Sequence, residues 1–183
     1  MIITISGKAG SGKGTIARGL VEKLGYRYIS IWDMKRELAS QMWLNIIEFS
    51  DLGELPENKE KFDLQYEEFQ KKLDVHENIV LDSRLSFYCQ PKAFKIFLTI
   101  SDEEAARRIF NDKNRIWDTY ANIEDLMIAT KRRNEEDVQR FKTLYGIDIM
   151  DMSQFDLVVD TTVSRAQYYI DFIVEKFQEF IKK

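Results

Sequence analysis

The chain contains 183 residues, of which 44% are hydrophobic and 32% are charged, and its formal net charge at pH 7 is −4. This length and apolar content are typical of one globular domain with its own core, and they exclude an intrinsically disordered chain. The mildly acidic balance and the lack of a basic tail argue against tight nonspecific binding to nucleic acid, so we expect no nucleic-acid partner.

The sequence also limits the compartment and the kinds of catalysis. No apolar run approaches the roughly 18 residues of a membrane-spanning helix, and no basic segment precedes the first apolar run, so we expect a cytoplasmic protein without membrane contact. Cys89 is the only cysteine, which excludes an internal disulfide and suits a reducing compartment. His76 is the only histidine and lies in a turn-like polar stretch, which excludes a histidine-based triad.

The first predicted strand, residues 2–6, leads into a glycine-rich stretch, and a helical pattern follows to Leu24, with Gly25 as its C-terminal cap. Strand, glycine-rich turn and helix in this order predict a phosphate-binding loop. Glycine lets backbone N–H groups point inward, the helix start adds more of them, and Lys13 supplies a mobile cation for the β- and γ-phosphates of ATP. The residues expected to bind the nucleotide are Gly7, Lys8, Ala9, Gly10, Ser11, Gly12, Lys13, Gly14 and Thr15.

This loop departs from the general motif at one position. The general motif has Ser or Thr directly after the lysine, where the hydroxyl binds Mg²⁺, whereas here the position is Gly14 and the hydroxyl follows at Thr15. The pattern resembles nucleoside monophosphate kinases more than GTPases or motor ATPases. We expect Thr15 and a carboxylate elsewhere to serve the metal. A turn that merely joins a strand to a helix is the alternative, but spacing, lysine and flanking patterns argue against it.

The pattern of strand then helix repeats after the loop. A strand is predicted over 26–31, and Ser30 or Asp33 can cap the helix that follows. Turn-forming residues at 50–56 precede a charged helix predicted over 57–73. The apolar stripe of this helix is expected to pack against the core rather than to stack on bases, and it consists of Phe62, Tyr66, Phe69 and Leu73.

The second half of the chain adds three predicted strands, at 78–82, 94–100 and 155–161. Ser101 or Asp102 caps a helix that ends near Phe110, and Ser101 with Glu104 fits a capping box. A long charged helix covers 123–145, and Ser164 caps the last helix. Strands that alternate with helices imply a parallel sheet covered on both faces. We therefore predict an α/β protein with the three-layer P-loop NTPase fold and roughly five parallel strands.

Two stretches interrupt this rhythm, residues 32–77 and 111–145. We interpret the first as an insertion that binds a phosphoryl acceptor, and the second as a mobile lid that closes over the donor and excludes water. The single domain would then have a core made of 1–31, 78–110 and 146–183.

Phosphoryl transfer depends mainly on positioning and charge neutralisation, so one carboxylate and several cations are expected. Asp82 ends a predicted strand at the carboxyl edge of the sheet, where it would bind Mg²⁺ directly or through water; a turn aspartate is the alternative. Arg84 follows two residues later and can bind an acceptor phosphate with its guanidinium group. Arg36 can do the same, although a solvated helix residue is an equal alternative.

The long helix over 123–145 carries Arg133 and Arg140, which are seven residues apart and therefore lie on one face about 10 Å apart. The same residues fit two ordinary helix pairs, Arg133 with Asp137 and Glu136 with Arg140. Position alone does not choose between lid cations and surface pairs.

Five segments together resemble a known family: GSGKGT in the loop, ISIWDMKRELA at 29–39, NIVLDSRL at 78–85, RRNEEDVQRFKTLYGIDIMD at 132–151 and FDLVVDTT at 155–162. They resemble the archaeal-type cytidylate kinases, a branch of the nucleoside monophosphate kinases, over nearly the whole chain. The resemblance implies transfer from ATP, with Mg²⁺, to CMP or dCMP. It implies that Lys13 contacts the donor phosphates and that Arg36 and Arg84 bind the monophosphate. It also implies that Arg108, Arg133 and Arg140 are lid-side cations. We expect Lys13, Arg84, Arg133 and Arg140 to act in catalysis and Arg108 to contact the donor nucleotide.

The chain departs from this family near the acceptor side. The family usually has glycine in place of Trp32, Glu-Gly-Arg in place of the segment from Asp82 to Arg84, and glutamate in place of Asn134. It commonly has a further arginine near 112–113. We expect a monomeric enzyme for small nucleotides; UMP or a non-nucleotide metabolite is the alternative acceptor, and a regulatory protein that hydrolyses ATP slowly is the alternative class.

Recognition of cytosine requires a hydrogen-bond acceptor near its exocyclic amine, because uracil has an oxygen at that place. Asp63, one turn before Glu67 in the acceptor-side insertion, is the candidate for this contact. The equal alternative is that Asp63 is one more charge on a solvated helix.

Overall fold

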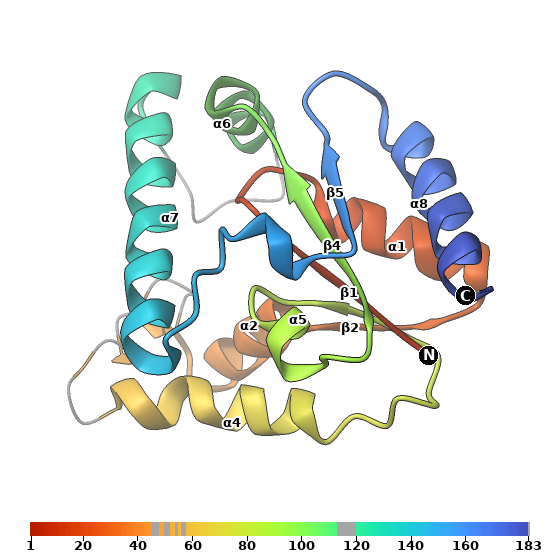
Figure 1. Cartoon of the computed structure of the whole chain (residues 1–183). Helices are drawn as coiled ribbons and strands as arrows, with labels where there is room; N and C mark the ends of the chain where they lie inside the picture. The colour runs from red at the N-terminus through yellow and green to blue at the C-terminus, as the bar shows by residue number, and fades with distance from the viewer. Residues whose placement is uncertain (45–47, 50–51, 54, 56–57, 113–119, 183) are drawn as a thin grey trace.

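The computed structural model describes residues 1–44, 48–49, 52–53, 55, 58–112 and 120–182. Within these residues, five parallel strands form one sheet in the order β2-β3-β1-β4-β5 (Figure 1). The strands are β1 Ile2–Gly7, β2 Arg27–Ser30, β3 Ile79–Asp82, β4 Phe94–Thr99 and β5 Leu157–Asp160. The predicted α/β fold is confirmed, and each of these strands lies close to its predicted range.

The sheet register determines which loops meet at the carboxyl edge. All four strand pairings are parallel, and β1 lies between β3 and β4. Asp82 at the end of β3 pairs with Ile5 on one side and with Ser30 on the other. Gly7 at the end of β1 pairs with Leu98 of β4. The glycine-rich loop, the end of β3 and the end of β2 therefore lie close together.

The helices follow the strands in the predicted order. They are α1 Lys13–Leu24, α2 Ile31–Gln41, α4 Lys59–Lys71, α5 Ser86–Cys89, α6 Asp102–Phe110, α7 Ile123–Tyr145, α8 Ala166–Phe180 and the short 3-10 helix η1 Met152–Gln154. The sequence analysis did not predict α5, because its 4 residues are too few to show a helical period.

Helices cover both faces of the sheet. One face packs against α1 and α8 (Figure 1), and this main core includes Ile5, Ile16, Leu20, Ile96, Ile173 and Phe177. On the other face, Phe97 of β4 contacts Phe155, which contacts Phe87 of α5, with ring centroids 4.9 and 4.6 Å apart. A smaller cluster joins α5 to the end of α7 through Leu85, Cys89, Phe141 and Ile147. The end of α7 is therefore anchored to the core.

Most helix ends follow the sequence signals. Gly25 and Gly146 end α1 and α7 in the left-handed conformation, with φ of 68° and 69°. The hydroxyl of Ser101 caps α6 by accepting a hydrogen bond from the N–H of Glu104 at 3.2 Å. The predicted cap at Ser164 is wrong, because α8 begins at Ala166 and the N–H of Ser164 donates to the hydroxyl of Tyr169 at 2.8 Å instead.

The apolar stripe of α4 matches the prediction in part. Tyr66 of the α4 stripe is buried and Leu73 packs against the core, whereas Phe69 is 37% exposed. The predicted turn at 50–56 and the middle of the predicted polar segment 111–122 lie largely outside the described residues. In the part of the chain that the structure describes, no helix has the length and apolar character to cross a membrane.

Candidate functional site

The glycine-rich stretch between β1 and α1 forms a tight loop at the carboxyl edge of the sheet. Gly7 has a φ of 145°, and a Cβ atom there would lie 2.3 Å from the carbonyl oxygen of Leu98. Gly10 has a φ of 79°, and a Cβ atom there would lie 2.9 Å from the backbone of Ala105. Only glycine lets the loop pass this close to β4 and α6.

Lys13 is the first residue of α1, and its side chain folds back over the loop. Its Nζ atom donates to the carbonyl oxygens of Gly7 and Lys8, each at 2.8 Å. The N-cap of α1 is Gly12, which has no side chain to accept hydrogen bonds from the N–H groups of the first turn. Thr15 lies exposed in this turn. Backbone N–H groups and one cation therefore converge at one place, as a phosphate group requires.

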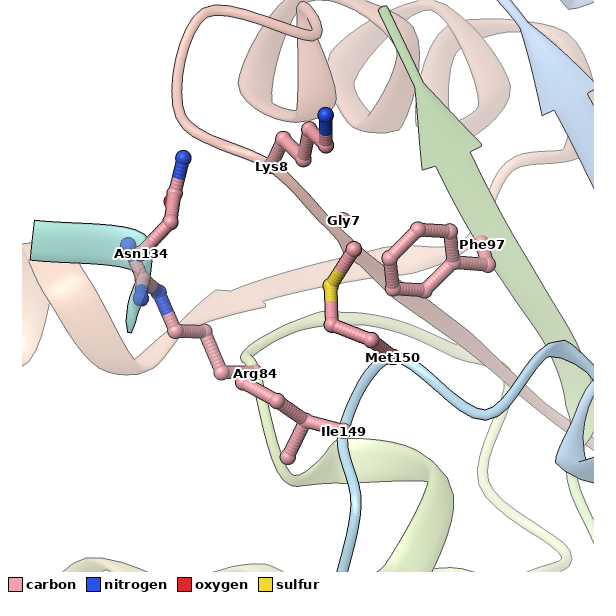
Figure 2. A pocket seen from close by; sticks show the side chains of 7 residues that line it. All are labelled: Gly7, Lys8, Arg84, Phe97, Asn134, Ile149 and Met150. Atoms are coloured by element: carbon pink, nitrogen blue, oxygen red, sulfur yellow. The ribbon is translucent and has the colours of Figure 1, made fainter. Parts of the chain in front are cut away.

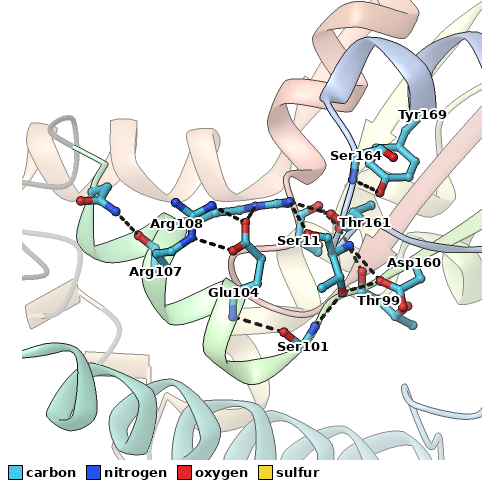
Figure 3. Close-up of polar contacts among 12 residues, drawn as sticks. Ser11, Thr99, Ser101, Glu104, Arg107, Arg108, Asp160, Thr161, Ser164 and Tyr169 are labelled. Carbon is cyan, nitrogen blue, oxygen red and sulfur yellow. Dashed lines mark hydrogen bonds and ion pairs between the residues drawn. The ribbon is translucent and has the colours of Figure 1, made fainter.

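A network of polar contacts joins the loop to α6 and to the end of β5 (Figure 3). The guanidinium group of Arg108 donates to Glu104 at 2.8 Å and to the carbonyl oxygen of Thr161 at 2.6 Å. The hydroxyl of Thr161 donates to the carbonyl oxygen of Ser11 at 3.0 Å. Hydrogen bonds from Arg107 and Arg108 lower the pKa of Glu104 to about 2. The network holds Arg108 beside the loop.

Asp82 lies at the end of β3, between the loop and α2. The hydroxyl of Tyr28 donates to its Oδ2 atom at 3.3 Å. Burial raises the pKa of Asp82, the charge of Lys13 opposes this shift, and the charge of Asp33 adds to it. Burial and Asp82 together raise the pKa of Tyr28 to about 12. Two carboxylates and Lys13 therefore lie within electrostatic reach of one another at this edge.

The loop after β3 is tied to β1. The hydroxyl of Ser6 donates to the carbonyl oxygen of Ser83 at 2.9 Å, and the N–H of Ser83 donates to the carbonyl oxygen of Ile5 at 3.2 Å. These bonds fix the backbone from which the side chain of Arg84 extends.

Arg84 belongs to a cluster of cations. Its guanidinium group pairs with Asp137 of α7, and both side chains are about one-fifth exposed. Burial and the nearby charges of Arg133 and Arg140 lower the pKa of Arg84, while the ion pair with Asp137 acts in the opposite direction. Three arginines therefore lie within electrostatic reach of one another on the side of the site that faces α7.

Asp63 on α4 links two further cations of this cluster. Its Oδ1 atom accepts a hydrogen bond from Lys35 Nζ of α2 at 2.9 Å, and its Oδ2 atom pairs with the guanidinium group of Arg140 of α7. Asp63 is 6% exposed. Because ion pairs engage both oxygens, this geometry favours a role other than the predicted contact with a base.

The remaining predicted cations lie at the edges of the cluster. The guanidinium carbon of Arg133 lies 4.8 Å from the ring centroid of Trp32, which joins α7 to α2. Arg36 pairs with Asp33 one turn earlier on α2, and both side chains are about two-fifths exposed. Arg133 therefore faces α2, whereas the contact of Arg36 with Asp33 is one that a solvated helix residue also makes.

A pocket lies between the loop and the cation cluster. Its lining consists of Gly7, Lys8, Arg84, Phe97, Asn134, Ile149 and Met150 (Figure 2). Figure 2 shows Arg84 and Asn134 close together on one side and Met150 beside Phe97 on the other. A ligand in this pocket would touch the loop and Arg84 at once.

The two pairs that the sequence suggests within α7 do not form among the described residues. Instead, Glu136 pairs with Arg132, and Asp137 pairs with Arg84. The predicted capping box at the start of α6 forms only in part, because the carboxylate of Glu104 binds arginines. Charged residues that the sequence spacing pairs within one helix therefore pair with other residues, and Asp137 pairs with a residue outside α7.

Sequence reasoning missed three charged residues of the site. They are Lys35, Asp137 and Glu104. Each lies in a helix with many charges, and helical spacing does not show which of these charges faces a neighbouring element. The spacing between Ser101 and Glu104 was the one available signal, and it indicated a cap rather than an arginine partner.

The chain is similar to a known protein family along most of its length. The sequence profile of the cytidylate kinase-like family matches residues 2–163. The chain belongs to this family. The cytidylate kinase of Methanothrix thermoacetophila is 35% identical over 161 residues, which cover 88% of each chain. Membership of this family makes the chain a phosphotransferase of the nucleoside monophosphate kinase type.

Another relative is a longer protein. The S-adenosylmethionine-dependent nucleotide dehydratase of Lacinutrix mariniflava is 34% identical over 182 residues, which cover 97% of this chain and 36% of that protein. The chain therefore spans about a third of that relative. Among solved structures, a shikimate kinase from Bacteroides thetaiotaomicron superposes with a TM-score of 0.67 at 16% identity. The superposition covers 100% of this chain and 99% of the shikimate kinase, which shows a shared fold.

Proposed function

We propose that the protein transfers the γ-phosphoryl group of ATP to CMP or dCMP, with Mg²⁺, and acts as a monomer. The observation that carries this proposal is the pairing of two phosphate-binding regions across one pocket. The loop with Lys13 lies on one side, and the cluster around Arg84 lies on the other. A kinase needs this arrangement because donor and acceptor phosphates must meet in line.

The charge of the cluster suits a phosphate monoester. Four cations lie in it, namely Lys35, Arg84, Arg133 and Arg140. Asp63 pairs with Lys35 and Arg140, and Asp137 pairs with Arg84. A monophosphate carries roughly two negative charges at neutral pH. Guanidinium groups gathered at one place favour the binding of such an anion.

The residues divide between donor and acceptor in this proposal. The loop from Gly7 to Thr15 holds the donor phosphates, Lys13 neutralises charge on the migrating group, and Arg108 contacts the donor nucleotide. Arg84 and Arg36 hold the monophosphate, and Arg133 and Arg140 stabilise the transferred group. We infer that 32–77 is the acceptor-binding insertion and that 111–145 is the lid. No covalent intermediate is required, because the acceptor oxygen is already anionic.

The residues around Asp82 fit a magnesium ion. Mg²⁺ takes oxygen ligands and binds through one or two carboxylates, phosphates and water. Asp82 is a desolvated carboxylate beside Lys13, and Asp33 and the exposed hydroxyl of Thr15 offer further oxygens at this edge. Asp82 would hold the ion, and the ion would supply positive charge that neutralises the donor phosphates.

The base is the part of the proposal that family membership supports most. Relatives at this level of identity include proteins named cytidylate kinases. Another relative is a nucleotide dehydratase, and its name also indicates a nucleotide substrate. Trp32 and Ser83 lie at the acceptor side, where the family usually has smaller residues. UMP or another small acceptor is therefore the competing assignment.

A panel of acceptors tests the proposal. ADP release is measured with ATP and Mg²⁺ against CMP, dCMP, UMP, AMP and GMP, with shikimate as a control for likeness of fold alone. We expect turnover with CMP or dCMP to exceed that with UMP by at least tenfold. Faster turnover with UMP would overturn the base assignment. ATP hydrolysis that no acceptor stimulates would favour a slow regulatory ATPase instead.

A further inference from the structure

We propose that Asp63 is a positioning residue that holds Arg140 in place for phosphoryl transfer by binding it together with Lys35. This inference rests on the proposed kinase function. The three residues belong to α4, α7 and α2, which are separate along the chain. One carboxylate therefore joins both acceptor-side helices to the helix that carries Arg133 and Arg140.

Lys35 forms one half of this bridge and is itself tightly held. Its side chain is 14% exposed, and its Nζ atom lies 5.1 and 5.0 Å from the ring centroids of Phe62 and Tyr66. Burial lowers the pKa of Lys35, and Asp63 opposes that shift. A buried ammonium group in an aromatic environment needs a counterion, and Asp63 is in hydrogen-bonding contact with it. Lys35 thus fixes one oxygen of Asp63.

Arg140 forms the other half, and it needs a restraint because its neighbours repel it. The side chain is 20% exposed and pairs with the second oxygen of Asp63. Arg84 and Lys35 both lie within electrostatic reach of Arg140. A guanidinium group among like charges moves away from them unless an anion holds it. Asp63 supplies that anion from a position that Lys35 has already fixed.

Two roles of Asp63 predict different effects of its loss: one on the placement of Arg140, and one on the attraction of an anionic acceptor to the cluster. Loss of the negative charge on Asp63 makes the cluster more positive, which attracts an anionic acceptor more strongly. The same loss removes the ion pair through which Asp63 orients Arg140, and small misplacements of a catalytic group reduce rates roughly 100-fold. Asp63→Asn is therefore expected to lower kcat by roughly 30- to 100-fold while the KM for the monophosphate stays the same or falls.

Two matched variants separate this effect from a loss of stability. Glu67→Gln removes another buried acid of α4, 2% exposed and beside Tyr145 of α7, and it should leave kcat within twofold of the wild type. The double variant Lys35→Met with Asp63→Asn removes both buried charges, so it should recover the thermal midpoint that Asp63→Asn loses. It should not recover kcat, because Arg140 still lacks its carboxylate. Recovery of kcat in the double variant would overturn the proposal.

A second readout does not depend on turnover. In spectra of protein labelled with ¹⁵N-arginine, the Nε–H signal of Arg140 is assigned by its loss in Arg140→Lys. We expect this signal to be slow to exchange in the wild type and in Glu67→Gln, and averaged in Asp63→Asn. An unchanged signal in Asp63→Asn would overturn the positioning role. If the wild type phosphorylates no monophosphate, the proposed function fails, whereas this measurement still decides whether Asp63 holds Arg140.

Discussion

The proposed donor side and the proposed acceptor side of the site are built in different ways. The donor side comes from one continuous stretch, Gly7 to Thr15, and the groups proposed to bind phosphate there are mainly backbone N–H groups. The acceptor side comes from four separate elements, whose side chains form ion pairs through Asp63 and Asp137. A site made of backbone groups depends on the conformation of the loop, which glycine allows. A site made of ion pairs depends on a balance of charge that one substitution can change.

The difference also concerns how the two sides are held. The donor loop is fixed by hydrogen bonds from Lys13 and Thr161 to its carbonyl oxygens. On the acceptor side, ion pairs through Asp63 connect α2, α4 and α7, and a hydrogen bond from Ser6 restrains the backbone of the loop after β3. We therefore expect donor-side variants to change the rate without changing the fold, and acceptor-side variants to change both.

The largest effect is expected from Lys13→Ala. The substitution removes the cation from the migrating phosphoryl group, so kcat should fall by roughly 1000-fold or more. The far-ultraviolet circular dichroism and the thermal midpoint should stay close to those of the wild type, because Lys13 contributes little to the core. Lys23→Ala, on the same helix and paired with Asp171 at the surface, is the control. Wild-type activity in a folded Lys13→Ala protein would remove the donor-site assignment.

Arg84→Gln should show the mixed behaviour of the acceptor side. The loss of a guanidinium group at the monophosphate should lower kcat/KM for the acceptor by roughly 100-fold. Asp137 would also lose its partner, which should cost about 1–2 kcal/mol of stability in this partly buried place. Adding Asp137→Asn should restore the thermal midpoint but not kcat/KM. Restored kcat/KM in this double variant would make Arg84 a structural residue only.

Asp82→Asn tests the metal at the boundary between the two sides. Half-maximal activity should require roughly tenfold more Mg²⁺, and an unchanged Mg²⁺ titration would contradict the assignment.

The pKa of Asp82 is raised in the folded protein, so the ionised carboxylate destabilises the fold, and the free energy of unfolding falls as pH rises from the ordinary pKa of an aspartate to the raised one. Asp82→Asn should therefore raise the thermal midpoint at neutral pH. In the wild type, activity should be lost on acidification at a higher pH than for an ordinary aspartate.

The same comparison explains how far the sequence alone could lead. The strands and the loop were predictable because their signals are local: apolar runs, glycines and Lys13 all lie within a few residues of each other. Asp82 was predictable as a position at a strand end, although its neighbours were not. The short helix α5 and the start of α8 at Ala166 were missed or misplaced, because four residues show no period and Ser164 only resembles a cap.

The acceptor side was predictable only in its cations. Arg84 and Arg140 were named from the sequence, but their partners Asp137 and Asp63 were assigned otherwise. Local rules pair charges three or four residues apart, since only those distances are visible in a helix. The actual pairs join residues up to 77 apart, which no spacing rule can show.

The smallest effects concern helix caps on the donor side, where sequence signals were correct in one case and wrong in the other. Ser101→Ala removes the bond to the N–H of Glu104, so we expect a loss of about 1 kcal/mol and a fall of about 2–4 °C in the thermal midpoint. Because α6 carries Arg108, the KM for ATP should also rise slightly. Ser164→Ala should change neither quantity, because the hydrogen bond of Ser164 to the hydroxyl of Tyr169 is donated by the backbone N–H, which alanine keeps. Equal losses in both variants would show that the hydroxyl of Ser164 stabilises the fold after all, and that backbone contacts alone do not hold the donor side.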